Sequence, residues 1–196
     1  AEPELRDRVR DDPSWFQKAG VALTQGLRET LRIVVPKPED RYRTCVPLVP
    51  LQAAAGASGD PQYVHDDDWD WVDIGAVRKL RAGMFVAQVV GKSMEPQIPD
   101  GAFCLFASPV VGSRQGKIVL VELADAVDPE TGERYTVKRY ESEKTEDDDG
   151  GWRHVRVTLR PNNPDFEPIE LRVDDENVVA VVGEFLEVVG GAGALG

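Results

Sequence analysis

The chain has 196 residues, with 23 Lys and Arg against 35 Asp and Glu, and its formal net charge is −12. This acidity argues against the basic face that a self-sufficient nucleic-acid binder needs, so direct DNA binding by this chain is not expected. The length suits one domain with a short appendage, and no apolar run approaches the roughly 18 residues of a membrane helix, so we expect no membrane contact and a cytoplasmic location.

The cysteines and histidines are few and far apart. Cys45, Cys104, His65 and His154 form no closely spaced pair in the sequence. Zinc sites and CxxC redox chemistry need such pairs, so we expect no metal and no cofactor. Two lone cysteines suit a reducing compartment and are expected to be buried packing residues. With so few histidines, a Ser-His-Asp triad is not expected either.

One amphipathic helix is predicted near the start of the chain. Asp12 and Pro13 are a typical N-cap and first helical residue, and the helix is expected to end before Pro36. Its apolar face recurs at three- and four-residue spacing, at Phe16, Ala19, Leu23, Leu27 and Leu31. No second helix follows, so a helix-turn-helix is not predicted. Residues 1–45 are therefore expected to be a helical segment and linker that packs or dimerises.

From residue 46 onward the sequence changes to short apolar runs separated by turn residues. Residues 46–51 are predicted to be extended, and the small residues of 53–61 are predicted to form an exposed loop. The acidic and aromatic segment 66–71 is predicted to be solvated, with Trp69 or Trp71 covering the edge of the core.

Six strands are predicted downstream, because Val, Phe and Tyr dominate runs that recur at regular spacing. They are residues 84–90, 102–106, 117–123, 134–140, 155–160 and 178–184. Turn residues separate them at 99–101 and 128–132, and the acidic run 146–151 is predicted to be a hairpin loop. Many short strands with no interleaved helices indicate a mostly β domain, a folded, barrel-like sheet over residues 46–189, with a flexible tail at 190–196.

The segment 89–101 carries the strongest chemical signal. A predicted strand ends at Gly91, and Ser93 lies just after it on the turn. Gly91 allows a sharp bend or a close backbone approach, while Pro96 and the turn at 99–101 stiffen the chain after Ser93. A serine placed in this way exposes its Oγ and leaves backbone N–H groups free, and these are a nucleophile and oxyanion donors for acyl transfer. An ordinary turn serine is the alternative.

The nucleophile needs a base, and lysine is the candidate once histidine is set aside. Lys138 lies in the predicted strand 134–140, where alternation places it on one face with Thr136 and Tyr140. A lysine accepts a proton only when it is neutral, and neutrality requires burial away from water. Lys92 is adjacent to Ser93, but neighbouring side chains on an extended segment diverge, so Lys138 is preferred. A solvent-facing strand lysine is the alternative.

Four separated motifs resemble the LexA-like family of Ser/Lys self-cleaving peptidases, which includes LexA, UmuD and the C-terminal domains of phage repressors. They are Gly91-x-Ser93-Met94-x-Pro96-x-Ile98-x-Asp100-Gly101, Val137-Lys138-Arg139, the segment 159–169 that begins Leu-Arg-Pro-Asn-Asn, and an Ala55-Gly56 bond in the small-residue loop, 37 residues before Ser93. The resemblance covers about residues 46–189.

This resemblance implies a fold, a site and a substrate. The fold would be the folded β-sheet that LexA-like proteins share with signal peptidases. Ser93 would be the nucleophile and Lys138 the general base, while Gly91 and Met94 would have oxyanion or positioning roles. The substrate would be the chain's own loop, cut between Ala55 and Gly56 after the loop swings into the site. Tethering gives this loop a high effective concentration, so a modest dyad suffices.

The resemblance also implies partners and a pathway. Such proteins usually dimerise through this domain, and the apolar segment 178–182 is the candidate dimer strand. A recombinase filament on single-stranded DNA would be the activator of cleavage. The cleavage would then be a switch in a stress-response protein of the SOS type, a transcriptional regulator or a defence protein. Two departures are a single helix in residues 1–48, where repressors carry a DNA-binding domain, and a lengthened hairpin at 125–133.

Two other functions compete with self-cleavage. The first is a peptidase that acts on other chains, like a signal peptidase, which shares the Ser-Met-x-Pro arrangement. The second is a module without catalysis, which dimerises or docks peptides within a larger protein.

Overall fold

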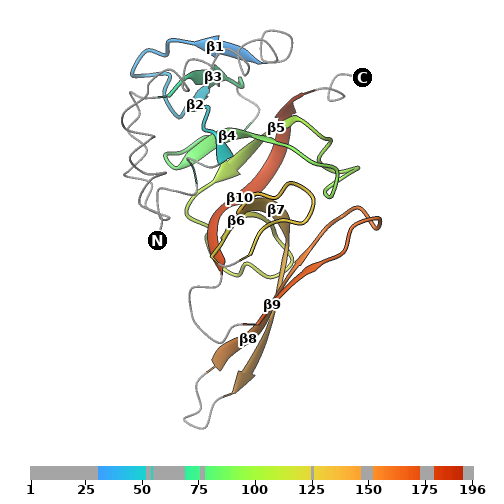
Figure 1. The fold of residues 1–196 in the computed structure, drawn as a ribbon. Helices are drawn as coiled ribbons and strands as arrows, with labels where there is room; N and C mark the ends of the chain where they lie inside the picture. Colours follow the sequence, from blue (N-terminus) through green and yellow to red (C-terminus); the bar gives the residue numbers. More distant parts are fainter. Residues whose placement is uncertain are drawn as a thin grey trace, which may run out of the picture.

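The computed structural model describes residues 31–51, 54, 69–75, 78–124, 126–146, 152–172 and 179–191 (Figure 1). Only the backbone is described for 144–146 and 152–155. The predicted helix up to residue 30, the Ala55-Gly56 bond, His65 and most of the predicted tail lie outside the described residues. Among the described residues, no helix is long and apolar enough to cross a membrane.

The described chain is mostly β, as predicted, and it forms two antiparallel sheets. The smaller sheet has the order β1-β3-β2, with β1 at Arg32–Val34, β2 at Cys45–Pro47 and β3 at Trp71–Asp73. The larger sheet has seven strands in the order β4-β5-β10-β6-β7-β8-β9. Its strands are β4 Met84–Val89, β5 Ala102–Ala107, β6 Ile118–Leu123, β7 Tyr135–Glu146, β8 Trp152–Arg160, β9 Ile169–Arg172 and β10 Val179–Gly190.

The long strand β10 folds the larger sheet. Its first half, from Val179 to Glu184, pairs with β6, and its second half, from Glu184 to Gly190, pairs with β5. Register shifts interrupt both pairings, and such bulges bend and twist a strand. In Figure 1, β10 runs from the β6–β7 part of the molecule up to β5. This curvature brings the end of β4 toward β7, where the candidate site lies.

Six predicted strands correspond to β4, β5, β6, β7, β8 and β10, and their existence is confirmed. β7 continues to Glu146, well beyond its predicted end, and β9 was not predicted. β10 extends through Gly190, which pairs with Phe103, one residue beyond the predicted end of the domain.

Two predictions near the N-terminus are wrong in part. Residues 32–34 form β1, so a helix that ends just before Pro36 is excluded over its last turn. Ile33 and Val34 are β-branched and pair with Val72 and Trp71 of β3, which favours a strand. The second correction concerns the segment predicted to be solvated, because Trp71 at its end begins strand β3. The predicted burial of a tryptophan there is confirmed, since Trp71 is only 3% exposed. The aromatic and β-branched side chains of β3 outweigh the flanking acids.

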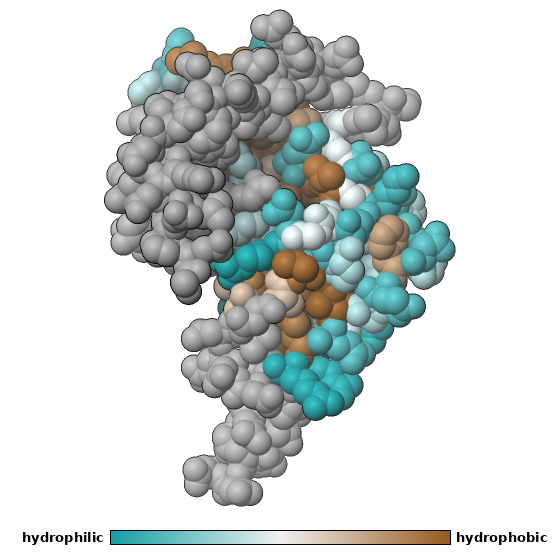
Figure 2. All heavy atoms as spheres, viewed as in Figure 1, coloured by the Kyte–Doolittle hydropathy of each residue, from teal (hydrophilic) through white to brown (hydrophobic). Residues whose placement is uncertain are grey.

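A central core lies beneath the strands that carry the candidate site. Its buried residues are Val49, Ala54, Phe85, Ala87, Val89, Met94, Ile98, Ala102, Cys104, Phe106, Ile118, Leu120, Val137 and Val182. These residues come from five strands of the larger sheet, from the chain after β2 and from the turn after Ser93. On the face shown in Figure 2, hydrophilic and hydrophobic residues alternate, and the hydrophobic ones reach the described surface in small groups.

Both cysteines are buried and unpaired, which confirms the predicted packing role. Burial raises the pKa of the Cys104 thiol to about 12, so this side chain stays protonated at neutral pH. Within the described part of the chain, no group of three or more His, Cys, Asp and Glu side chains is arranged to hold a metal ion.

Candidate active site

The turn that carries Ser93 is built by the residues predicted to bend the chain. Gly91 has a φ of +109°, a conformation that side-chain-bearing residues rarely adopt, and its N–H donates to Asp100 Oδ1 at 2.8 Å. Gly101 closes the turn, because its N–H donates to the Val89 carbonyl at 2.9 Å. Met94 follows Ser93 and is buried in the central core. The turn is thus tied to both β4 and the core, and Ser93 itself is buried at 5% exposure.

Lys138 comes to the site from the middle of the sheet. It lies on β7, where it pairs with Val119 of β6, and its neighbour Val137 enters the central core. The Lys138 side chain is only 3% exposed. The burial that a lysine base requires is therefore present.

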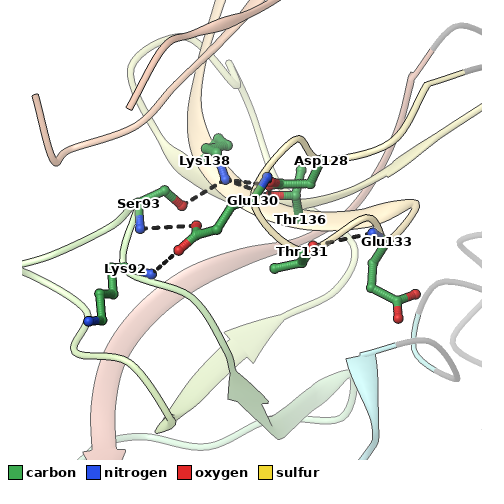
Figure 3. Close-up of polar contacts among 8 residues, drawn as sticks. All are labelled: Lys92, Ser93, Asp128, Glu130, Thr131, Glu133, Thr136 and Lys138. Atoms are coloured by element: carbon green, nitrogen blue, oxygen red, sulfur yellow. Dashed lines mark hydrogen bonds and ion pairs between the residues drawn. The ribbon is translucent and has the colours of Figure 1, made fainter. Parts of the chain in front are cut away.

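The Lys138 ammonium group meets Ser93 directly. Its Nζ donates to Ser93 Oγ at 2.9 Å, although the two residues are 45 positions apart in the sequence (Figure 3). Nζ also donates to Thr136 Oγ1 at 2.7 Å and to Asp128 Oδ2 at 2.6 Å. These three acceptors match the three N–H groups of a protonated lysine.

Asp128 is the buried carboxylate of the site. It lies in the connection between β6 and β7 and is 2% exposed. Burial alone would raise the pKa of Asp128, but the hydrogen bonds from Lys138 and Thr136 outweigh it, and the net effect is a lowered pKa. Lys138 Nζ thus makes its ion pair with Asp128 while it also contacts Ser93 Oγ.

Two backbone N–H groups point to one place beside the Ser93 hydroxyl. The N–H of Lys92 donates to Glu130 Oε1 at 2.5 Å, and the N–H of Ser93 donates to Glu130 Oε2 at 3.2 Å. Adjacent amide donors next to a nucleophile are the arrangement that stabilises the oxyanion of an acyl-transfer intermediate. In this structure a carboxylate occupies them (Figure 3).

The segment after β8 clamps the Ser93 turn from the other side. The N–H groups of Asn162 and Asn163 both donate to the Ser93 carbonyl at 2.9 Å. The Asn163 side chain donates to the Lys92 carbonyl at 3.1 Å, and the Asn162 side chain donates to Gln97 at 2.7 Å. In a planar trans peptide the N–H points opposite to the C=O, so fixing the Lys92 carbonyl also aims the Ser93 N–H.

The predicted site residues are brought together only in part. Ser93 and Lys138 meet, whereas Lys92 extends its side chain away from them in Figure 3. The two donors at the carboxylate belong to Lys92 and Ser93, while the Gly91 N–H binds Asp100. Met94 contributes a buried side chain. The predicted scissile bond lies outside the described residues.

Sequence reasoning missed five residues of the site, namely Asp128, Glu130, Thr136, Asn162 and Asn163. The two asparagines stood within a recognised motif without an assigned role. Thr136 was placed on the face of Lys138 by strand alternation alone. The two acids lay in a segment recognised only as a turn, and no sequence signal showed which surface that turn would cover.

Comparison with known proteins agrees with the geometry. A family model described as Peptidase S24-like matches residues 47–186, well over half of the chain. A search of curated proteins found no match. The matched range contains the Ser93 turn, Lys138 and the strands that position them.

Proposed function

Because the chain belongs to the peptidase S24-like family, we propose that Ser93 and Lys138 are a catalytic dyad that cleaves a peptide bond. The contact between Lys138 Nζ and Ser93 Oγ at 2.9 Å, with both residues buried, is the observation that carries this proposal. The adjacent amide pair adds the donors that acyl transfer requires.

In the proposed reaction, neutral Lys138 takes the Ser93 hydroxyl proton while Oγ attacks the carbonyl carbon of the scissile bond. The carbonyl oxygen becomes an oxyanion at the N–H groups of Lys92 and Ser93. The C–N bond then breaks, the leaving amine takes the proton from Lys138, and an ester to Ser93 remains. Water attacks that ester, giving one proton to Lys138. Collapse of the second intermediate returns the proton from Lys138 to Ser93 and releases a carboxylic acid, which loses its remaining proton to water.

The proposed substrate is the chain's own loop, cut between Ala55 and Gly56. Ala54, one residue upstream of Ala55 at this bond, is buried in the same central core as Met94, the residue after the proposed nucleophile. The chain that leads into the loop is thus anchored in the core that also holds the Ser93 turn. Tethering makes the attack effectively unimolecular, which lowers the demand on the dyad. Such a cut would act once as a switch, in a stress-response, transcriptional or defence protein.

Intact-mass measurement after incubation at about pH 9 to 10 tests this function, since alkaline conditions favour neutral lysine. We expect two fragments that meet between Ala55 and Gly56. Ser93→Ala should give none, and Lys138→Met should slow cleavage by roughly 100-fold or more. Lys79→Met is the matched control, because Lys79 is an exposed lysine outside the site, and it should cleave as the unaltered chain does.

The same experiment separates the competing functions. If no fragments form while an added Ala-Gly peptide is cut in a Ser93-dependent way, the protein acts on other chains. If neither substrate is cut and Ser93 also fails to react with a serine-directed probe, the dyad assignment is wrong and a docking or dimerisation module becomes the better account.

A further inference from the structure

The connection between β6 and β7 contains a tight acidic turn, residues 128–133, built to hold its shape. Asp128 Oδ1 accepts the Glu130 N–H at 2.8 Å, and the Asp128 carbonyl accepts the Gly132 N–H at 2.8 Å. The Asp128 N–H in turn donates to the Glu133 carbonyl at 2.8 Å. Aspartate before proline is typical of a turn, and Gly132 supplies the positive φ of +72°.

This acidic turn reaches the proposed dyad at two separate points. Asp128 Oδ2 lies 2.6 Å from Lys138 Nζ, and both side chains are 3% exposed. Glu130 places one carboxylate oxygen on each of the N–H groups of Lys92 and Ser93. A single turn thus contacts the proposed base and the proposed oxyanion donors together (Figure 3).

The Glu130 carboxylate is closely fitted into its place. A Cβ atom added at Gly91 would lie 2.8 Å from Glu130 Oε2 and 2.9 Å from its carboxyl carbon, so the end of the Glu130 side chain would have to shift. The absence of a side chain at Gly91 therefore makes room for this carboxylate. A carboxylate with two oxygens on two amides resembles the negatively charged oxygen that forms during acyl transfer.

We propose that the acidic turn is a built-in inhibitor of the Ser93–Lys138 site, in which Glu130 fills the oxyanion donors and Asp128 holds Lys138 as an ammonium ion. The inference rests on the proposed function, because it assigns inhibition to a site whose catalysis is itself proposed. A scissile carbonyl cannot use the two N–H groups while Glu130 binds them. Lys138 cannot accept the Ser93 proton while its Nζ already carries three protons.

One movement would remove both obstacles. Thr131, Gly132 and Glu133 are exposed, so the tip of the acidic turn can shift without uncovering the central core. Asp128 and Glu130 belong to this one turn and would leave together. A binding event on the exposed tip, or the arrival of the substrate loop, would thus switch the site on.

Chemical labelling of Ser93 by a fluorophosphonate probe, followed by intact mass, tests the inhibitor without requiring self-cleavage. The variants are Glu130→Ala and Glu130→Gln. Glu133→Gln is the matched control, because it removes a charge from the same turn while Figure 3 shows the Glu133 side chain directed away from the site. Ser93→Ala is the negative control, because it has no hydroxyl group at this position to be labelled.

We expect both Glu130 variants to label roughly 10- to 100-fold faster than the unaltered chain, the range that corresponds to losing a charge-assisted hydrogen bond. Glu133→Gln should label at the unaltered rate. The amide proton resonances of Lys92 and Ser93 should also move upfield in both Glu130 variants and stay in place in Glu133→Gln.

Two failures would be distinguishable. Equal labelling in all chains except Ser93→Ala, with both amide resonances unmoved, would overturn the inhibitor and leave the peptidase proposal standing. No labelling at Ser93 in any variant would overturn the peptidase proposal and the inhibitor with it.

Discussion

Strand β7 carries two ion pairs of the same length in opposite surroundings. Lys138 pairs with Asp128 at 2.6 Å, and Glu141, three residues further along the strand, pairs with Arg160 at 2.6 Å. Both side chains of the first pair are 3% exposed, whereas those of the second are 35% and 51% exposed. Distance alone would rank them equally, so their difference must come from the solvent that surrounds them.

Burial changes what each pair does. Water screens the Glu141–Arg160 pair and competes for its hydrogen bonds, so it contributes little to stability. The Lys138–Asp128 pair has lost that water and depends on its few partners. Among the acids whose side chains the structure describes, Asp128 is the buried one, and the others are at least partly exposed. Asp128 shows that acidity in a turn can instead be directed into the centre of a site.

Removing one partner from each pair should give the largest difference between them. Asp128→Ala leaves Lys138 buried without its counter-ion, and we expect the free energy of unfolding to fall by about 3–5 kcal/mol. Glu141→Ala should leave it nearly unchanged, because Arg160 remains in water. Urea denaturation followed by tryptophan fluorescence measures both.

Equal losses of unfolding free energy in the two variants would show that burial does not make the two pairs differ in their contribution to stability. The double variant Asp128→Leu with Lys138→Met provides a further check, since replacing both charges by apolar groups should recover much of the stability.

Low pH should reduce the stability that the buried Lys138–Asp128 pair contributes. The pKa of Asp128 in the folded protein lies below its ordinary value of 3.8, because hydrogen bonds from Lys138 and Thr136 outweigh burial. A carboxyl group with a lowered folded pKa adds stability that is complete above its unfolded pKa and is lost as the pH falls through the folded value. We therefore expect Asp128→Asn to flatten the loss of stability below about pH 4.

The measurement is denaturant unfolding at a series of pH values from about 2 to 7, compared with Glu141→Gln. A curve for Asp128→Asn that stays parallel to that of the unaltered chain down to pH 2 would contradict the lowered pKa.

Much of the fold could be predicted because side-chain periodicity is local. Six strands of the larger sheet have β-branched and aromatic runs bounded by turn residues, and all six exist. β3 could not be predicted in this way, since the acids beside Trp71 mask its strand character until β1 and β2 pair with it on both sides. β9 was missed because its alternation spans only four residues.

Less of the site than of the fold could be predicted, because the site depends on how distant segments are placed in space. Gly91 and Ser93 carry local turn chemistry. Lys138 followed from the need for a base other than histidine and from strand alternation, and the resemblance supported it. The acids of residues 128–133 were equally visible as a turn, but their role depends on where that turn lies in space. That placement follows from the pairing of β6 with β7 and from the curvature of β10, which are long-range properties. A turn signal in the sequence predicts a bend in the chain, but it does not tell which distant residues that turn will contact.

High salt should have the smallest effect on the free energy of unfolding, and it should separate the exposed ion pair from the buried one. At 1 M salt the screening length falls to about 3 Å, which weakens exposed charge pairs far more than buried ones. Any difference in unfolding free energy between Glu141→Gln and the unaltered chain should therefore disappear between about 0.05 and 1 M NaCl. The deficit of Asp128→Asn should persist over the same range, because solvent ions do not reach Lys138. If salt removed both differences alike, the Lys138–Asp128 pair would have to be open to water, and its proposed hold on the lysine proton would weaken with it.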